Sequence, residues 1–247
     1  MSTDKQRNDT NLTIPHTDVD RDKRRLYGRR QGRPLKPERA SVLDSLLPQL
    51  QIQPDALKPA SLRDVDLFGR AFTGGMWFEI GFGNGEHVAA LHRQHPDTAF
   101  IGAEPFINGM SAFLKDIQDD DTANVRVWMD DAILVVNALA DQTLDGIYVL
   151  NPDPWPKKRH YKRRIISPEN LNRFARVLKP GGMLIMATDV DDLAEWMRDQ
   201  AEAHPAFTWT GHPADLHTMP EGWIPTRYEE KGRAAGRVQT YLLYKRA

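Results

Sequence analysis

Acidic residues follow a glycine-rich turn in this 247-residue chain, at a spacing that suits the binding of a nucleoside. The segment 78–86 reads FEIGFGNGE, an apolar run that leads into Gly81, Gly83 and Gly85. Glycines let a backbone turn tightly and approach a ligand closely, and a helix after the turn points its amide-rich end at that ligand. Glu104 follows Gly81 by 23 residues, where a carboxylate can accept hydrogen bonds from both ribose hydroxyls.

A nicotinamide dinucleotide would use the same kind of turn, but three features favour another ligand. The glycine spacing is G-x-G-x-G and not G-x-G-x-x-G. Glu79 lies two residues before the first glycine, where it would repel a pyrophosphate and attract a cationic amino-acid group. The pair Asp130-Asp131 closes a later apolar run, in a position to bond an adenine amino group. We therefore expect S-adenosylmethionine, a sulfonium with an ammonium group, and keep the dinucleotide as the alternative.

A second motif, NPDPW at 151–155, leads directly into a basic strip at 157–164. Ligands of doubly wound sheets bind beyond the carboxyl ends of the strands, so Asp153 is expected to face the reacting group. The two prolines stiffen the turn, and Trp155 offers a face on which a base can stack. The plainer alternative is a proline-rich strand exit in which Trp155 only plugs the core.

The composition is that of a globular domain, and it excludes several kinds of chemistry. Hydrophobic residues make up 40% of the chain, and no apolar run approaches the ~20 residues of a membrane span. The first twenty residues lack the apolar core of a signal peptide, which indicates a soluble, cytoplasmic protein. Because cysteine is absent, disulfides, cysteine-bound metal and thiol nucleophiles are excluded. His87, His92 and His95 share one predicted helix without a further ligand set, so no metal is expected.

Positive charge is concentrated in two short segments, although the formal net charge is only −1. Residues 21–39 hold nine Lys and Arg, and residues 157–164 hold six, which leaves the rest of the chain acidic. This pattern favours a focused site for a polyanion such as nucleic acid. Solvated surface charge is the plainer explanation.

Apolar strands that alternate with periodic helices from Trp77 onward predict βαβ units and a mostly parallel, seven-stranded sheet with helices on both faces. Strands are expected at 76–81, 98–103, 125–129, 145–150, 182–187, 206–210 and 238–244. Helices are expected at 41–47, 85–94, 107–117, 131–140, 168–178 and 190–203. The KPGG run at 179–182 predicts a helix stop and a turn. Residues 1–40 are predicted to be a mobile basic tail before a catalytic domain at 41–247.

These motifs together resemble the bacterial tRNA (guanine-N7-)-methyltransferase family, over nearly the whole chain. The resemblance rests on FEIGFGNGE, GAEPF at 102–106, the DPW turn with its basic strip, MATD at 186–189 and TRYE at 226–229. The run YGRRQGRPL is also similar to the amino end of some members. The resemblance implies a Rossmann-like class I fold, S-adenosylmethionine as cofactor, and methylation of a guanine in the tRNA variable loop, position 46. Asn151 departs from the aromatic residue of many members, and Arg227 replaces a lysine.

The resemblance also implies roles for individual residues of this chain. Glu79, Glu104, Asp131 and Asp153 match cofactor-site positions, and Asp153 also matches the catalytic aspartate. The implied substrate contacts are Lys157, Asp189, Thr226, Arg227, Tyr228 and Glu229. The implied RNA-contact strip consists of Arg159, His160, Tyr161, Lys162, Arg163 and Arg164.

Methylation of guanine N7 fits the chemistry of these residues. The N7 atom has an in-plane lone pair and needs no deprotonation, and the transfer leaves a positive charge that a carboxylate at Asp153 would favour. Selecting guanine requires an acceptor for its N1–H and N2–H groups, a role assigned here to Glu229. Asn151 gives the turn a similarity to the NPPY turn of exocyclic-amine methyltransferases, so that target stays open. A non-catalytic RNA-binding module on the same scaffold is the other alternative, and the sequence leaves the oligomeric state open.

Overall fold

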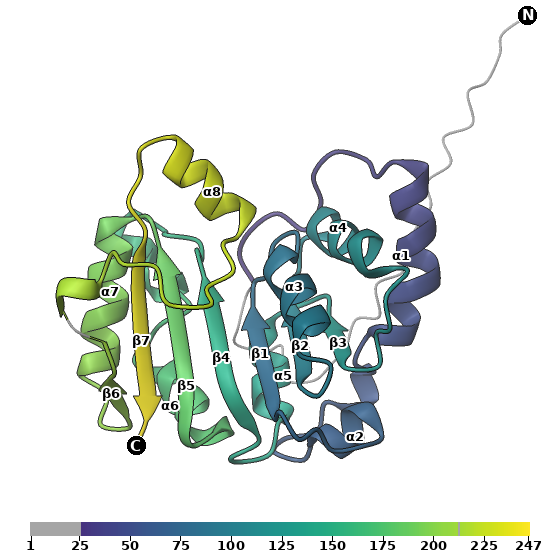
Figure 1. Cartoon of the computed structure of the whole chain (residues 1–247), viewed down its shortest axis with the longest axis horizontal. Coiled ribbons are helices and arrows are strands. Elements are labelled where there is room, and N and C mark those ends of the chain that lie inside the picture. The colour runs from purple at the N-terminus through teal and green to yellow at the C-terminus, as the bar shows by residue number, and fades with distance from the viewer. Residues whose placement is uncertain (1–25, 212) are drawn as a thin grey trace, which may run out of the picture.

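Seven apolar runs form one sheet in the computed structural model, which describes residues 26–211 and 213–247 (Figure 1). The strands are β1 Met76–Ile80, β2 Ala99–Ala103, β3 Val125–Trp128, β4 Leu144–Leu150, β5 Leu178–Thr188, β6 Phe207–Trp209 and β7 Thr240–Arg246. Their order across the sheet is β3-β2-β1-β4-β5-β7-β6. Strand β7 is antiparallel to both β5 and β6, whereas the other neighbours are parallel. The predicted mostly parallel seven-stranded sheet is therefore confirmed.

Helices connect the strands, and several begin at residues that suit a helix start. The α-helices are α1 Pro37–Leu50, α2 Asp64–Phe68, α3 Glu86–Gln94, α4 Ile107–Ile117, α5 Ala132–Ala138, α6 Pro168–Val177, α7 Asp191–Glu202 and α8 Arg227–Ala234. Short 3₁₀ turns lie at Pro54–Ala56, Lys158–Arg163 and Pro213–Asp215. Ser167 caps α6 by accepting the Asn170 amide, with Pro168 in the first helical position.

The helices cover both faces of the sheet, because alternate residues of its strands are apolar on each side. On one face, α1, α3 and α4 pack around Phe100, Val125 and Val127. On the other face, α5, α6 and α7 bury a larger cluster that includes Phe78, Ile147 and neighbouring strand residues. A third, smaller cluster around Tyr241 includes Trp223 of the segment before α8. Helices thus cover one whole face of the sheet and the β1–β3 half of the other, and its carboxyl edge is available for a site.

The structure corrects several expected boundaries. Helix α1 begins at Pro37 and ends at Leu50, whereas the sequence predicted 41–47. The KPGG run does not form a separate turn but lies in β5, where the register with β4 shifts and Gly181 takes a φ of 81°. Helices α2 and α8 were not predicted, because each is short and carries few apolar residues to set a period.

The basic segment predicted as a tail divides into two parts. Residues 1–25 lie outside the described residues. Residues 26–36 run along the domain, where the Ile107 amide donates to the Arg30 carbonyl and Asn108 bonds the backbone at both Gly32 and Arg33. This second part therefore belongs to the folded domain rather than to a tail. Within the described part of the chain, no helix has the length and apolar character to span a bilayer.

Candidate functional site

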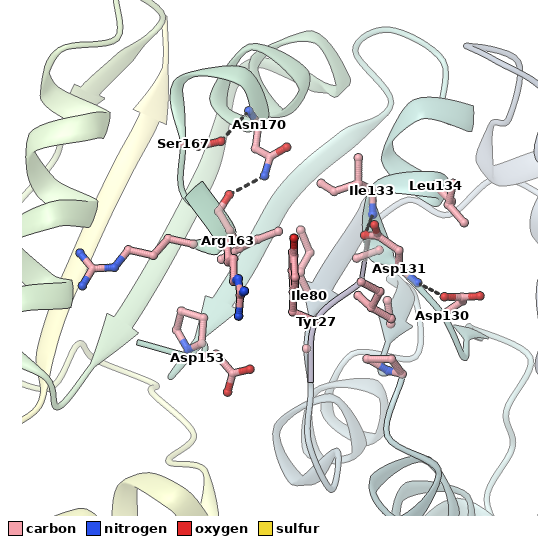
Figure 2. Close-up of a pocket in the computed structure, with 18 of the residues that line it drawn as sticks. Tyr27, Ile80, Asp130, Asp131, Ile133, Leu134, Asp153, Arg163, Ser167 and Asn170 are labelled. Carbon is pink, nitrogen blue, oxygen red and sulfur yellow. Dashed lines mark hydrogen bonds between the residues drawn. The ribbon is translucent and has the colours of Figure 1, made fainter. Parts of the chain in front are cut away.

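The main cavity lies at the carboxyl edge of the sheet, where the chain reverses its winding direction between β1 and β4. It has a volume of about 1380 Å³ and is lined by residues that follow four neighbouring strands. These residues include Gly81 after β1, Glu104 after β2, Asp131 after β3 and Asp153 after β4. Four sequence-predicted site residues from separate segments therefore line one cavity. Figure 2 shows two of them, Asp131 and Asp153, on opposite sides of it.

The glycine turn and Glu104 form the wall of the cavity next to β1 and β2. The Gly83 amide donates to one oxygen of Glu104 at 2.7 Å, and the Phe106 amide donates to the other at 2.9 Å. Gly81 and Gly83 both have positive φ angles, and open space lies where their side chains would be. Burial raises the pKa of Glu104, and the nearby charges of Asp153 and Glu79 add to that increase, while the two amides oppose it.

Gly85 has a different role from its two neighbours. It starts α3 with a φ of 80°, and a side chain at this position would lie 2.3 Å from Phe113 of α4. Gly85 does not line the cavity. This glycine allows close packing of α3 against α4, whereas Gly81 and Gly83 face the cavity.

Glu79 also lies off the cavity lining, although the sequence predicted it as a cofactor-site residue. Its carboxylate lies 2.7 Å from Nδ1 of His87, and both side chains are 3% exposed. The His87 ring meets the edge of Tyr148 and approaches Trp223. The structure thus makes His87 a buried partner of Glu79, in line with its interpretation as a packing residue. No group of three metal-binding side chains occurs within residues 26–211 and 213–247.

Asp153 separates the main cavity from a second, smaller one. The small cavity has a volume of about 80 Å³ and is lined by Asp153, Asp189 and Tyr228, among others. The turn that holds Asp153 is strained, because the flanking residues Asn151 and Trp155 have φ angles of 48° and 44°. Although the Asp153 side chain reaches solvent, the surrounding protein displaces enough water to raise its pKa. One carboxylate is therefore shared by two cavities.

The basic strip forms a 3₁₀ turn, Lys158–Arg163, beside the Asp153 turn. Lys157, Arg159 and Lys162 are exposed, and Lys162 and Arg163 line the main cavity. Partial desolvation and four neighbouring cations lower the pKa of His160, which indicates that positive charge is poorly compensated here. Tyr161 donates its hydroxyl to Asp192 at 3.0 Å.

Arg164, by contrast, does not present its charge to solvent. Its side chain is 1% exposed, stacks on Tyr161, and donates to the Pro154 carbonyl and to Asp192. Although Arg164 was predicted to contact RNA, its guanidinium ties the strip to the Asp153 turn and to α7 in this structure. No sequence pattern pointed to Asp192, which lies 28 residues away.

The predicted substrate segment around α8 also divides into exposed and buried residues. Thr226 caps α8, Arg227 lies 3.8 Å from Glu86, and Tyr228 is 51% exposed. The Asp189 side chain is 3% exposed, and it accepts a hydrogen bond from Arg237 at 2.5 Å.

Glu229 lines neither cavity, and only 1% of it is exposed. Its carboxylate accepts hydrogen bonds from Trp223 at 2.9 Å, Tyr241 at 2.5 Å and Arg233 at 2.9 Å. The structure therefore places Glu229, predicted to read the guanine edge, away from both cavities. The three donors make it an anchor for α8.

Three cavity residues were missed or undervalued in the sequence. Asp130 lines the cavity, and its carboxylate accepts the Asp131 amide and the Arg30 guanidinium. Asp131 itself caps α5 by accepting the Ile133 amide. Tyr27 and Arg30 come from the segment predicted as a mobile tail. Its composition therefore gave no sign that these two residues line the cavity.

Comparison with known proteins places the chain among methyltransferases. A family model described as "Putative methyltransferase" matches residues 74–242. A tRNA (guanine-N(7)-)-methyltransferase of Mesorhizobium japonicum is 44% identical over 90% of this chain and 94% of its own length. A protein of the same name from Rhizobium meliloti is 43% identical over 90% of this chain and 95% of its own length.

Solved structures show the same fold at much lower identity. A 16S rRNA methyltransferase, KamB, aligns with a TM-score of 0.52 and 16% identity, over 74% of this chain and 91% of its own. TrmN from Thermus thermophilus aligns with a TM-score of 0.50 and 12% identity, over 74% of this chain and 47% of its own. The Rossmann-like fold is thus shared with proteins of low sequence identity, whereas identity above 40% is found with the tRNA (guanine-N(7)-)-methyltransferases. By that match over nearly its whole length, the chain belongs to the tRNA (guanine-N(7)-)-methyltransferase family.

Proposed function

We propose that this chain transfers the methyl group of S-adenosylmethionine to N7 of a guanine in tRNA, with Asp153 between cofactor and base. The observation that carries this arrangement is that Asp153 lines both the main cavity and the small one. The target is the guanine at position 46 of the variable loop, as the motif resemblance implies. Because tRNA is the substrate, the enzyme acts in the cytoplasm.

The hydrogen-bonding groups that line the main cavity match those of the cofactor. Each oxygen of Glu104 has one backbone donor, and a carboxylate has about four acceptor positions, so it can also accept from two ribose hydroxyls. The open space at Gly81 and Gly83 allows a ligand to approach the backbone. Asp131 lies at the end of β3, in a position to accept from an adenine amino group. When bound there, S-adenosylmethionine supplies an electrophilic methyl group.

Asp153 favours the reaction by electrostatics rather than by proton transfer. Guanine N7 needs no base, and positive charge develops on the guanine as its methyl bond forms. A carboxylate that is already fixed and partly desolvated stabilises this charge without reorganising. The surrounding structure imposes strained backbone angles at Asn151 and Trp155, on either side of Asp153, as is common near functional sites.

The guanine base enters the site through the small cavity. Asp189 lines it and takes over the acceptor role for the guanine N1–H and N2–H groups, because Glu229 is enclosed by its three donors. Tyr228 is exposed at the same cavity and supplies a ring face for stacking. The cations of the strip, Lys157, Arg159 and Lys162, hold the RNA backbone nearby.

Mass analysis of nucleosides from treated tRNA tests this function. The protein is incubated with unmodified tRNA and S-adenosylmethionine, and the tRNA is then digested. We expect 7-methylguanosine, and nuclease mapping should place it at a single position in the variable loop. A methyl group on an exocyclic amine would favour the alternative chemistry. Binding of tRNA without any methylated product would favour the non-catalytic RNA-binding module.

A further inference from the structure

The segment Leu26–Arg33, which we call the strap, crosses the mouth of the main cavity. Leu26, Tyr27 and Arg30 line this cavity together with the acidic residues of the strand ends. Figure 2 shows Tyr27 in the space between Asp153 and Arg163 on one side and Asp131 on the other. Gly28 is close enough to Asp153 that a side chain at its position would lie 3.9 Å from the carboxylate.

Two side-chain contacts fasten the strap to opposite walls of the cavity. Arg30 donates to Asp130 at 2.7 Å, and the Asp130 carboxylate is only 10% exposed. Tyr27 lies under the guanidinium of Arg163, 3.9 Å from the ring centroid, and meets Trp155 edge-on. The Tyr27 contact is thus a cation–π interaction at a partly exposed site.

Backbone hydrogen bonds fix the far end of the strap to α4. Besides the Ile107 amide on the Arg30 carbonyl, the Gly32 amide donates to Asn108 at 2.7 Å. Asn108 in turn donates to the Arg33 carbonyl at 2.8 Å. The strap therefore has a firm base at residues 30–33, while Tyr27 reaches over the cavity.

We propose that the strap completes the cofactor pocket, with Arg30 and Tyr27 as positioning residues for cofactor binding. Arg30 holds Asp130 beside Asp131, at the wall where the adenine is received. Tyr27 holds Arg163 against Trp155 and covers the cavity above Asp153. The inference rests on the proposed function, because it takes S-adenosylmethionine or its product as the ligand of the cavity.

Calorimetric binding of S-adenosylhomocysteine to four variants of the full chain tests the strap. Arg30→Ala should raise the dissociation constant roughly tenfold, as expected when a charge-assisted hydrogen bond at the wall is removed. Tyr27→Ala should raise it about fivefold, because the variant has no ring to stack under Arg163. Arg29→Ala removes an exposed cation from the neighbouring position, and Tyr27→Phe keeps the ring, so both should bind like the unaltered protein.

The outcomes separate the strap from the proposed function. If the unaltered protein does not bind S-adenosylhomocysteine, the proposed function fails. If the unaltered protein binds it and Arg30→Ala and Tyr27→Ala bind equally well, the strap inference is wrong. The strap inference is also wrong if these two variants lose only affinity for tRNA, since the strap would then serve the RNA.

Limited trypsin digestion gives a second test that needs no variant. Trypsin cleaves after Arg29 and Arg30, and both bonds lie in the strap. Saturating S-adenosylhomocysteine should slow cleavage at these two bonds several-fold, because ligand under the strap restrains its opening. An equal rate with and without ligand would overturn the inference, even if a strap variant proved unstable.

Discussion

Three carboxylates near the carboxyl edge of the sheet differ in their surroundings, and these differences determine what each can bind. Glu104 accepts two backbone amides and lines the cavity, so it can still accept from a ligand. Asp153 is partly desolvated and lies between two cavities. Glu229 is enclosed by three protein donors and has a structural role. Residue type alone does not distinguish them.

Cofactor binding should depend on the charge of Glu104. Replacing Glu104 by Ala should weaken S-adenosylmethionine binding by about 1.5–3 kcal/mol, the range of charge-assisted hydrogen bonds. Calorimetry measures this decrease, and the control is Asp97→Ala, which removes an exposed carboxylate from the turn before β2. Unchanged affinity would mean that other groups hold the ribose.

The raised pKa of Glu104 also gives a pH dependence with a definite sign. The ribose hydroxyls bind the ionised carboxylate. The affinity for the cofactor is therefore highest above the raised pKa of Glu104 and falls as the pH drops through it. In the cofactor-free protein the sign is opposite, because a raised folded-state pKa makes protonation favour folding. Calorimetry over a pH series should show a flatter profile for Glu104→Gln. Parallel profiles would contradict this assignment.

The sequence identified Glu104, Asp131 and Asp153 because each follows a strand, and parallel strands end at one edge of the sheet. It did not predict that Glu229 and Arg164 are buried, since their burial depends on partners brought together only by the fold. Arg164, for example, is enclosed by Asp192 and Tyr161.

Among the elements, α8 and the basic strip each depend on one buried charged residue, Glu229 and Arg164. Helix α8 has few apolar residues, and Glu229 joins it to Tyr241 on β7 and to Trp223 in the preceding segment. Arg164 joins the strip to the Asp153 turn and to α7. Periodicity predicted the long strands and helices well, but it does not detect a short polar helix whose main anchor is a carboxylate.

Replacing Glu229 by Ala should destabilise the protein by about 2–4 kcal/mol. The change leaves the Trp223 indole and the Tyr241 hydroxyl without their acceptor in a buried place. Thermal or urea unfolding measures the destabilisation, and Glu230→Ala, which removes an exposed neighbour on α8, is the control. If Glu229→Ala were as stable as the control but lost guanine selectivity, Glu229 would read the base after all.

Arg164 and Arg163 should respond differently to substitution. Arg164→Ala should lower the free energy of unfolding by about 1–3 kcal/mol, because the Pro154 carbonyl loses its donor. Turnover at saturating tRNA should also fall, since the Asp153 turn shifts and misplacement by about an ångström can cost a hundredfold. Arg163→Ala should lower the free energy of unfolding by less than Arg164→Ala does, because it removes cation–π contacts with Tyr27 and Trp155 rather than the donor of a backbone carbonyl. Equal stability of the two variants would refute the bracing role of Arg164.

Over the whole molecule, the basic strip and the basic strap meet at the main cavity, and the rest of the chain is acidic. This arrangement restricts where a polyanion can bind. The sequence showed the two charged segments but not their relation to the cavity. Composition alone predicts that deletion of residues 1–39 weakens tRNA binding and spares saturated turnover. The structure changes the second expectation, that turnover is spared, because the deletion also removes the strap and the start of α1.

The salt dependence of tRNA binding should show whether the cations of the strip contact phosphates. Removing one phosphate-binding cation should reduce the slope of log affinity against log salt by about 0.7–0.9. The double change Arg159→Ala and Lys162→Ala should therefore lower the slope by about 1.4–1.8. Lys58→Ala removes an exposed cation outside both basic segments and is the control. A slope equal to that of the unaltered protein would exclude the strip as the RNA-binding surface.

The central claim, that Asp153 stabilises the charge developing on guanine between two cavities, is tested most directly by single-turnover methylation. The rate is measured with saturating tRNA and S-adenosylmethionine for the unaltered protein and Asp153→Ala, with Asp191→Ala as an exposed-carboxylate control. We predict that Asp153→Ala slows the methyl transfer by two or more orders of magnitude, the scale expected when a preorganised charge partner is removed, and changes cofactor affinity by less than roughly tenfold. A near-normal rate for Asp153→Ala would contradict the account.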